Sequence, residues 1–259
     1  MLKHYHKHLV LQPFTRRQKH NMKKVFFVLL FLPFVQISYA QLFTKEKIKN
    51  QENIDKMKYS WGYYLGFNNY DFNFDYNKDL KDIQVEKTVG FNVGLIGNMR
   101  INDNLDLRLE PGLIISRRNL TYDESYFEGL DFNDSDLLRE VRSTYIHFPL
   151  LLKFSSNRVN NIKPFIVGGF SAALNLSSNE ENPDDNTVGQ FRTKRGMFFY
   201  ELGIGIDLYL FWFKFTPSIR GVFAMNDELI RDNDNLNSPW TSNIQTMKTR
   251  GLFINFTFQ

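Results

Sequence analysis

The chain has 259 residues, including 26 Phe, 12 Tyr and 3 Trp, an aromatic content that suits strands and membrane interfaces. It contains no Cys, which excludes disulfides, thiolate zinc sites, a thiol nucleophile and a lipoprotein anchor. The formal net charge of +4 arises in residues 1–40, which hold seven of the 32 Lys and Arg and no Asp or Glu. The rest of the chain has 25 Lys and Arg against 28 Asp and Glu. Because this part is slightly acidic, no nucleic-acid partner is expected.

The N-terminus has the pattern of an export signal. A short basic stretch at residues 22–24 precedes an apolar run at 25–37, and the small residue Ala40 stands just before Gln41. Basic, apolar and small residues in this order are typical of a secretory signal peptide. We therefore predict a signal peptide over residues 22–40, cleaved between Ala40 and Gln41.

The segments around the signal have weaker patterns. A membrane-spanning helix is the alternative to the signal peptide, but the apolar run is short and Pro33 interrupts it. Residues 1–21 are interpreted as a spurious or non-native extension, with translation beginning at Met22. Residues 41–58 are polar and lack a clear period, which favours a short periplasmic lead-in.

From residue 59 onward, apolar residues recur at every second position. In the clearest run, Phe198, Leu202 and Ile206 share one parity, and Glu201 and Asp207 share the other. A strand places these two sets on opposite faces, whereas a helix would scatter both. We predict strands near residues 59–70, 85–101, 105–120, 140–155, 162–177, 195–210, 212–225 and 248–258.

The predicted connections alternate between short and long. The short ones lie around residues 102–104, 157–161 and 211, and the long ones cover residues 71–84, 121–139, 178–194 and 226–247. This alternation is typical of a barrel with short periplasmic turns and longer external loops. The predicted fold is an all-β, antiparallel, up-and-down transmembrane β-barrel of about eight strands over residues 59–259, integral to the bacterial outer membrane. An even strand number places both termini in the periplasm.

The alternative is a soluble β-sandwich or a lipocalin-like barrel, in which the apolar face would point inward. Periodicity alone does not say which face is inside. The membrane barrel is favoured because the second face carries charges of both signs, which a soluble core would not tolerate. Outer-membrane lipid is then the expected surroundings of the Leu, Ile and Phe face.

Charged residues on the polar face are predicted to point into the lumen. They are Arg100, Arg108, Glu110, Lys153, Glu201, Asp207, Lys214 and Arg220. In so narrow a barrel these side chains would meet and fill the interior. Their mixed signs favour a structural network of paired charges; the alternative is an ion or ligand path through the lumen.

Catalytic and metal-binding signals are weak. His147 is the single His after residue 40, and Ser143 shares its face but stands about 13 Å away along a strand. A structural, hydrogen-bonded His is therefore favoured over a catalytic one. The acidic residues 180–185 could bind calcium but lack EF-hand spacing, so a solvated loop is the preferred interpretation. No cofactor, metal site or enzymatic activity is predicted.

A series of segments resembles the PorT family of outer-membrane barrels. In chain order they are WGYYLGFN (61–68), VGFNVG (89–94), LRLEPGL (107–113), RRNL (117–120), FPLLLK (148–153), PFIVGG (164–169) and YELGIGID (200–207). The single segments recur in many small barrels, whereas their order and spacing are more specific. The resemblance implies a non-catalytic role in protein secretion by a type IX system, with other secretion subunits as partners, and in gliding motility.

The C-terminus adds an expectation about assembly. Thr249, Gly251, Ile254 and Phe256 resemble the insertion signal read by the barrel-assembly machinery, although the chain ends one residue after its last aromatic, Phe258. Two alternatives to a secretion role remain open. One is an independent small barrel with a structural, adhesive or ligand-binding role. The other is a lipid-modifying barrel enzyme that depends on His147.

Overall fold

A computed structural model describes residues 49–181, 191–232 and 238–259. The predicted extension, the signal peptide and the Ala40–Gln41 cleavage site lie outside these residues. Within the described part of the chain, no helix is both long and apolar enough to cross a membrane.

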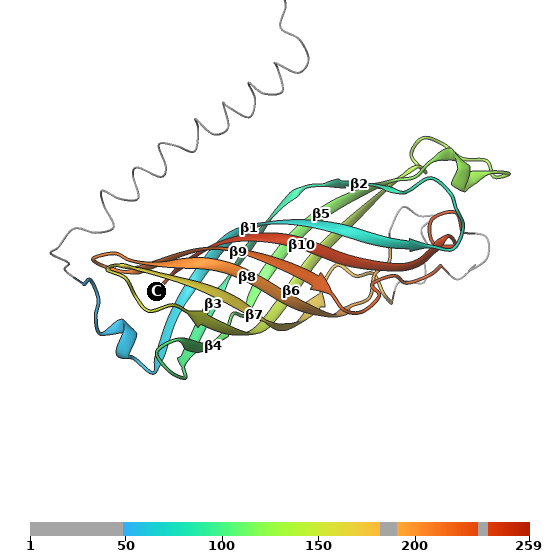
Figure 1. The fold of residues 1–259 in the computed structure, drawn as a ribbon. Coiled ribbons are helices and arrows are strands. Elements are labelled where there is room, and N and C mark those ends of the chain that lie inside the picture. Colours follow the sequence, from blue (N-terminus) through green and yellow to red (C-terminus); the bar gives the residue numbers. More distant parts are fainter. Residues whose placement is uncertain (1–48, 182–190, 233–237) are drawn as a thin grey trace, which may run out of the picture. The chain divides into compact units, whose positions relative to one another are not determined.

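Strands make up most of the described chain (Figure 1). They are β1 (Tyr59–Tyr76), β2 (Gln84–Lys87), β3 (Val89–Arg100), β4 (Leu105–Leu109), β5 (Gly112–Thr121), β6 (Leu138–Ser155), β7 (Ile162–Asn175), β8 (Gly196–Tyr209), β9 (Lys214–Ala224) and β10 (Ile244–Phe258). Two short 3₁₀ helices accompany them, η1 (Ile54–Lys56) and η2 (Glu124–Phe127).

These strands close into a ring. Each is antiparallel to its neighbours, and β1 pairs with β10 on one side and β3 on the other. β4 and β5 keep one register against β6, with Leu105 opposite Phe154 and Gly112 opposite His147, so they are one strand interrupted at Glu110. β2 and β3 likewise form one interrupted strand along β5. The described residues therefore form an eight-membered, up-and-down ring, which confirms the predicted fold.

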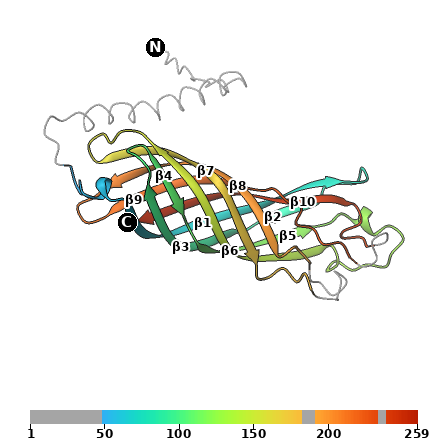
Figure 2. The same cartoon turned by 90° about the horizontal axis from the view of Figure 1, so that it is seen from below.

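Short and long connections lie at opposite ends of the barrel (Figures 1 and 2). Among the described residues, 101–104, 156–161 and 210–213 form the short turns, and 77–83, 122–137, 176–181, 191–195, 225–232 and 238–243 belong to the long loops. Every predicted strand is present, but β1 and β10 extend further than expected. Asp71 pairs with Arg250 and Asn73 with Lys248, so the two strands continue together into segments that were predicted as loops.

The outer wall and the interior differ in chemistry along the middle of the strands. Leu202 and Ile204 of β8 are each 62% exposed, whereas Glu201 and Asp207 are buried. The same alternation runs through β1, where Leu65 points outward and Asn68 inward. The apolar side chains therefore face outward and the polar ones inward, as expected for a barrel in lipid.

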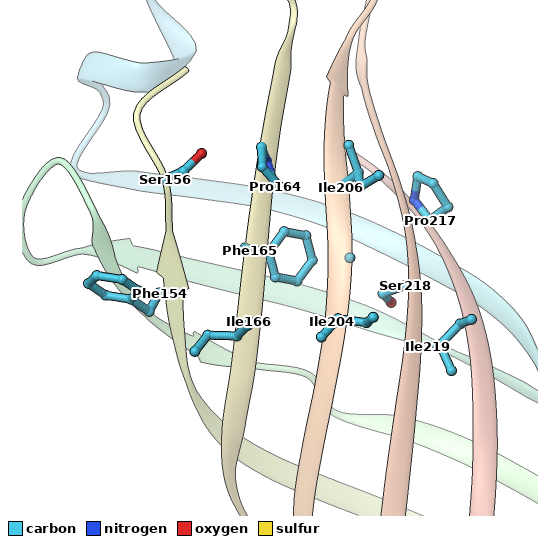
Figure 3. Close-up of a pocket in the computed structure, with 11 residues that line it drawn as sticks. Phe154, Ser156, Pro164, Phe165, Ile166, Ile204, Ile206, Pro217, Ser218 and Ile219 are labelled. Atoms are coloured by element: carbon cyan, nitrogen blue, oxygen red, sulfur yellow. The ribbon is translucent and has the colours of Figure 1, made fainter. Parts of the chain in front are cut away.

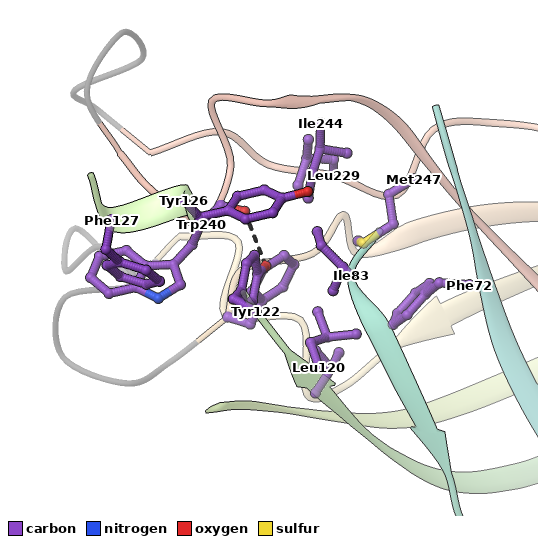
Figure 4. Packing of buried hydrophobic residues seen from close by; sticks show 12 residues of the cluster. Phe72, Ile83, Leu120, Tyr122, Tyr126, Phe127, Leu229, Trp240, Ile244 and Met247 are labelled. Atoms are coloured by element: carbon purple, nitrogen blue, oxygen red, sulfur yellow. Dashed lines mark hydrogen bonds between the residues drawn. The ribbon is translucent and has the colours of Figure 1, made fainter. Parts of the chain in front are cut away.

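An apolar cluster fills the long-loop end (Figure 4). We call it the loop-end core; its buried members are Phe72, Ile83, Leu120, Tyr122, Tyr126, Phe127, Val141, Phe191, Leu229, Trp240, Ile244 and Met247. The Tyr122 hydroxyl donates to the Trp240 carbonyl at 3.0 Å, and the Trp240 indole donates to the Asp136 carbonyl at 2.9 Å. Strand ends and long loops thus share one hydrophobic core.

The segment before β1 is tied to the short-turn end. Asp55 of η1 pairs with Arg158 at 2.9 Å and accepts a hydrogen bond from the Tyr209 hydroxyl at 2.6 Å. Asn50 donates its backbone N–H to Asn161 at 2.9 Å. Residues 49–58, part of the predicted lead-in, are thereby held against the β6–β7 turn and the end of β8.

Candidate functional site: the luminal charge network

A chain of ion pairs crosses the lumen. Arg108 pairs with Glu110 at 3.2 Å, and Arg220 pairs with both Glu110, at 2.7 Å, and Glu201, at 3.0 Å. Glu201 Oε1 lies 2.9 Å from His147 Nε2. All five side chains are buried. Because removal of one member leaves its partners charged and desolvated, this network is expected to be important for the folded state.

The five residues come from separate parts of the ring. Arg108 lies on β4, His147 on β6, Glu201 on β8 and Arg220 on β9, each at an inward-facing position. Glu110 stands at the break between β4 and β5, just before Pro111, and its N–H donates to the Pro149 carbonyl at 3.2 Å. The Glu110 N–H is therefore hydrogen-bonded in spite of the break in the strand, and the Glu110 carboxylate is free to reach Arg220 across the interior.

A second polar group lies nearer the short turns. Lys153 Nζ is 2.5 Å from Asp207 Oδ2, and the Thr216 hydroxyl donates to Asp207 Oδ1 at 2.7 Å. The Lys153 ammonium also lies 4.1 Å from the centre of the Phe165 ring. Lys214 is buried on the same face of β9 as Thr216 but forms no ion pair with a described residue.

A third polar group lies toward the loop-end core, and the sequence analysis missed it. Arg118 donates to Thr249 at 2.8 Å and Ser143 at 2.6 Å. Glu228 accepts from the Tyr145 hydroxyl at 2.5 Å and also from Thr249. Arg118 was recognisable, since two adjacent arginines on a strand must face opposite sides. Glu228 lies in a long loop, where alternation carries no information.

The predicted charges fall into two groups. The structure joins Arg108, Glu110, Glu201 and Arg220 in one ion-pair chain and brings Lys153 to Asp207, with Lys214 on the neighbouring strand. Arg100 does not join them. It lies at the end of β3 and pairs with Asp103 in the following turn, because β3 ends there.

The charged side chains inside the barrel are shielded from solvent at several levels of the lumen. Glu201 is 0% exposed, Lys153 1% and Arg118 0%, although they lie at different levels of the interior. Aromatic rings lie between the ion-pair chain and the loop-end core, with Tyr70, Tyr145, Phe199 and Phe253 in edge-to-face contacts. A water-filled pore would leave its lining accessible to solvent, so these levels are packed with side chains.

Comparisons with known proteins agree with the ring. The family described as outer membrane protein β-barrel domain matches residues 39–229. This chain belongs to that family. It is an outer-membrane β-barrel, and lipid surrounds its apolar wall. No curated protein matches the sequence.

Several solved structures resemble the barrel. The outer membrane protein OprG from Pseudomonas aeruginosa is 13% identical with a TM-score of 0.43, and the match covers 76% of this chain and 94% of that one. Neisserial surface protein A is 10% identical, with a TM-score of 0.40 and coverage of 78% and 98%. Ail of Yersinia pestis, solved with the heparin analogue sucrose octasulfate, is 11% identical, with a TM-score of 0.36 and coverage of 78% and 99%.

His147 and Ser143 were considered together as a possible catalytic pair. In this outer-membrane barrel their side chains contact different residues. His147 lies against Glu201, and its ring contacts Phe199 and Phe253 edge to face. Ser143 accepts a hydrogen bond from Arg118 at 2.6 Å. Within the described residues, no group of three or more His, Cys, Asp or Glu is arranged to hold a metal ion. Of the predicted acidic loop, residues 182–185 lie outside the described part.

A hollow of about 700 Å³ opens on the outer wall of the barrel near the short turns (Figure 3). Its lining is almost wholly apolar and includes Ile166, Ile204 and Ile219. Behind it, the Phe165 ring packs against Gly205, where a Cβ atom would come within 2.4 Å of the ring. The hollow is continuous with the lipid-facing side chains and presents little polar surface, so we assign it to lipid contact.

Proposed function

We propose that this barrel is a closed, non-catalytic subunit that supports protein secretion across the outer membrane by a type IX system. The observation that carries the proposal is the packed lumen, with its ion-pair chain and its loop-end core. A barrel without a water-filled path does not pass cargo through itself. It would act instead through its wall, its loops and its two ends.

The secretion role rests on the series of segments between residues 61 and 207 that resembles the PorT family. Several residues of that series occupy inward-facing positions in the barrel. Arg108 and Glu110 belong to the luminal network, and the glycines of YELGIGID lie beside it, with Gly203 directly opposite Arg220. The resemblance therefore extends to residues that build the interior as well as to those of the lipid-facing wall.

The proposed orientation puts the termini and the short turns in the periplasm. Export by a cleavable signal delivers the N-terminus there, and short turns are the periplasmic connections of outer-membrane barrels. The segment around Asp55, held by Arg158 and Tyr209, would then present a fixed surface to periplasmic partners. The loop-end core would face the cell exterior.

A clean deletion of the gene tests this proposal, with secretion of type IX cargo and gliding as readouts. We expect cargo to accumulate in the periplasm and to return to the medium when the wild-type chain is supplied. Crosslinking in intact outer membranes, followed by pull-down, should recover other secretion subunits. Normal cargo secretion by the deletion strain would contradict the proposal.

The alternative is an independent barrel that stabilises the membrane, adheres to surfaces or binds a ligand. The loop-end core favours it, since Tyr122, Tyr126 and Trp240 from the described parts of two long loops pack together there. In that case the deletion strain would secrete cargo normally, and exchange of the long loops would abolish adhesion or ligand binding. The two proposals therefore make opposite predictions for the same strain.

A further inference from the structure

A second hollow, of about 660 Å³, lies on the outer wall toward the long loops. Its lining includes Phe67, Phe91, Ile115, Arg117, Arg142 and Thr144. Phe67, Phe91 and Ile115 are outward-facing and between 42% and 52% exposed, so one part of the hollow is apolar. The other part carries two guanidinium groups and several hydroxyls.

The hollow coincides with an irregularity in the barrel wall. Lys87 is opposite Arg118, whereas Phe91 is opposite Ile115, so one strand carries an extra residue between these pairs. Such a bulge disrupts the ladder locally. The Ile115 carbonyl accepts a hydrogen bond from the Asn68 side chain at 3.2 Å, from the luminal side. Thr88 and Gly90 lie in this irregular stretch and line the hollow, so the irregularity and the hollow share one place on the outer wall.

Arg117 and Arg142 are directly opposite each other on β5 and β6. Like charges in this position repel, which destabilises a sheet unless an anion lies between them. Among the described residues, Glu140 is the carboxylate that pairs with both, at 3.6 Å from Arg117 and 2.7 Å from Arg142, and it does not line the hollow. The two guanidinium groups share this carboxylate, and their side chains are 54% and 72% exposed.

The position of the two arginines matches the edge of the lipid-facing wall. On β5 the outward residue changes from Ile115 to Arg117, a step of about 7 Å along the strand. A membrane lipid has the same division, with acyl chains beside apolar side chains and a charged headgroup beyond them. Guanidinium groups bind phosphate through paired, charge-assisted hydrogen bonds.

We propose that this hollow binds a phosphate-bearing lipid of the leaflet on the long-loop side. The phosphate would lie between Arg117 and Arg142 and relieve their repulsion, with the Thr144 hydroxyl close by. An acyl chain would lie over Phe67, Phe91 and Ile115. Under the proposed orientation that leaflet is the outer one, so lipid A is the probe of choice; the binding chemistry itself is independent of the secretion role.

Native mass spectrometry of the purified barrel in detergent, titrated with diphosphoryl lipid A, tests the proposal. We expect one tightly held lipid on the wild-type chain and an affinity at least roughly tenfold lower for the double variant Arg117→Gln/Arg142→Gln. Arg250→Gln is the matched control, because Arg250 is 53% exposed, faces outward and pairs with Asp71, but lies outside the hollow. Binding by this control should equal that of the wild type.

Three further results would overturn the proposal. One is equal binding of lipid A by the double variant, and another is an equal loss in Arg250→Gln, which would indicate general surface charge. The third is equal binding of dephosphorylated lipid A, which would remove the lipid phosphate as the recognised group. Heat-modifiable migration on gels verifies that each variant is folded. Cargo secretion plays no part in these readouts.

Discussion

The middle of the barrel and its long-loop end use the same strands with opposite polarity. In the middle, β1 points Phe67 outward and Asn68 inward; a few residues on, Asp71 faces outward and Phe72 is buried inside. On β5 the outward residue changes from Ile115 to Asn119 and the inward one from Ser116 to Leu120. Lipid surrounds the first region and water the second, so hydrophobic burial favours opposite faces.

The same hydrogen-bonded strands therefore continue from a lipid environment into water. The alternation of side chains stays in phase through the change, because a slip of one residue would reverse every face. The chemistry of the two faces reverses instead. Between the two regions lies a layer of aromatic residues, where Tyr70 contacts Tyr145 and Phe253.

The largest expected effect is on the polar interior of the middle region. Arg220→Met removes the cation shared by Glu110 and Glu201, which would leave two buried carboxylates under-compensated. We expect a loss of about 3–5 kcal/mol in the free energy of unfolding, measured by urea titration in detergent micelles. Arg250→Met, which breaks an exposed pair with Asp71, should cost at most about 1 kcal/mol. Equal losses would contradict a buried network.

Truncating a side chain in the apolar interior of the long-loop end should lower the free energy of unfolding. Leu120→Ala removes a side chain that is 0% exposed within the loop-end core, and we expect destabilisation of about 2–5 kcal/mol in the same titration. Leu202→Ala removes the same atoms from an outward position that is 62% exposed to lipid. No packed cavity forms there, so its cost should be clearly smaller. A larger loss at Leu202 would reverse the assigned faces.

Charge on the outer wall tests the boundary between lipid and water. Ile204→Arg places a guanidinium at an outward position in the middle of β8, which should cost about 2–4 kcal/mol if that position faces the hydrocarbon core. Asn119→Arg, outward on β5 beside Glu140, should be nearly neutral in the same measurement. Comparable stabilities for the two variants would place Ile204 in water.

The smallest effect concerns an exposed pair between two long loops. Lys81 lies 2.6 Å from Asp123, and this hydrogen bond lowers the pKa of Asp123 below its ordinary value of 3.8. A lowered carboxyl pKa adds stability that is present above the unfolded value and is lost as pH falls through the folded one. Carboxyl NMR titration should give a midpoint below 3.8 for Asp123. Lys81→Gln should raise it, and an unchanged midpoint would count against the pair.

The sequence predicts the strands well in the lipid-facing region and less well at the long-loop end. Where lipid lies outside, alternation of apolar and charged residues predicted the strands and the inward positions of Glu201, Asp207 and Arg220. Beyond Tyr70, alternation continues in YDFNFDY, but its polarity is reversed and the segment reads as a polar loop. β1 and β10 were therefore predicted too short.

Contacts made by long loops were beyond reach of the sequence pattern. Glu228 meets Tyr145 and Thr249 because the β9–β10 loop packs against the strand ends, and no local period encodes that path. The pairing of Arg220 with Glu110 depends on the ring closing, since the two residues are 110 positions apart. Sequence parity gives the face of a residue, whereas its partner depends on how the ring is closed.

Conductance across a planar lipid bilayer tests the packed lumen most directly. Purified wild-type barrel, verified as folded by heat-modifiable migration, is inserted at known protein-to-lipid ratio, with a general porin as the control for insertion. Because side chains at several levels of the interior are buried, we predict no stable unitary current from the wild-type chain. Reproducible current steps from the folded wild-type protein would contradict a closed barrel.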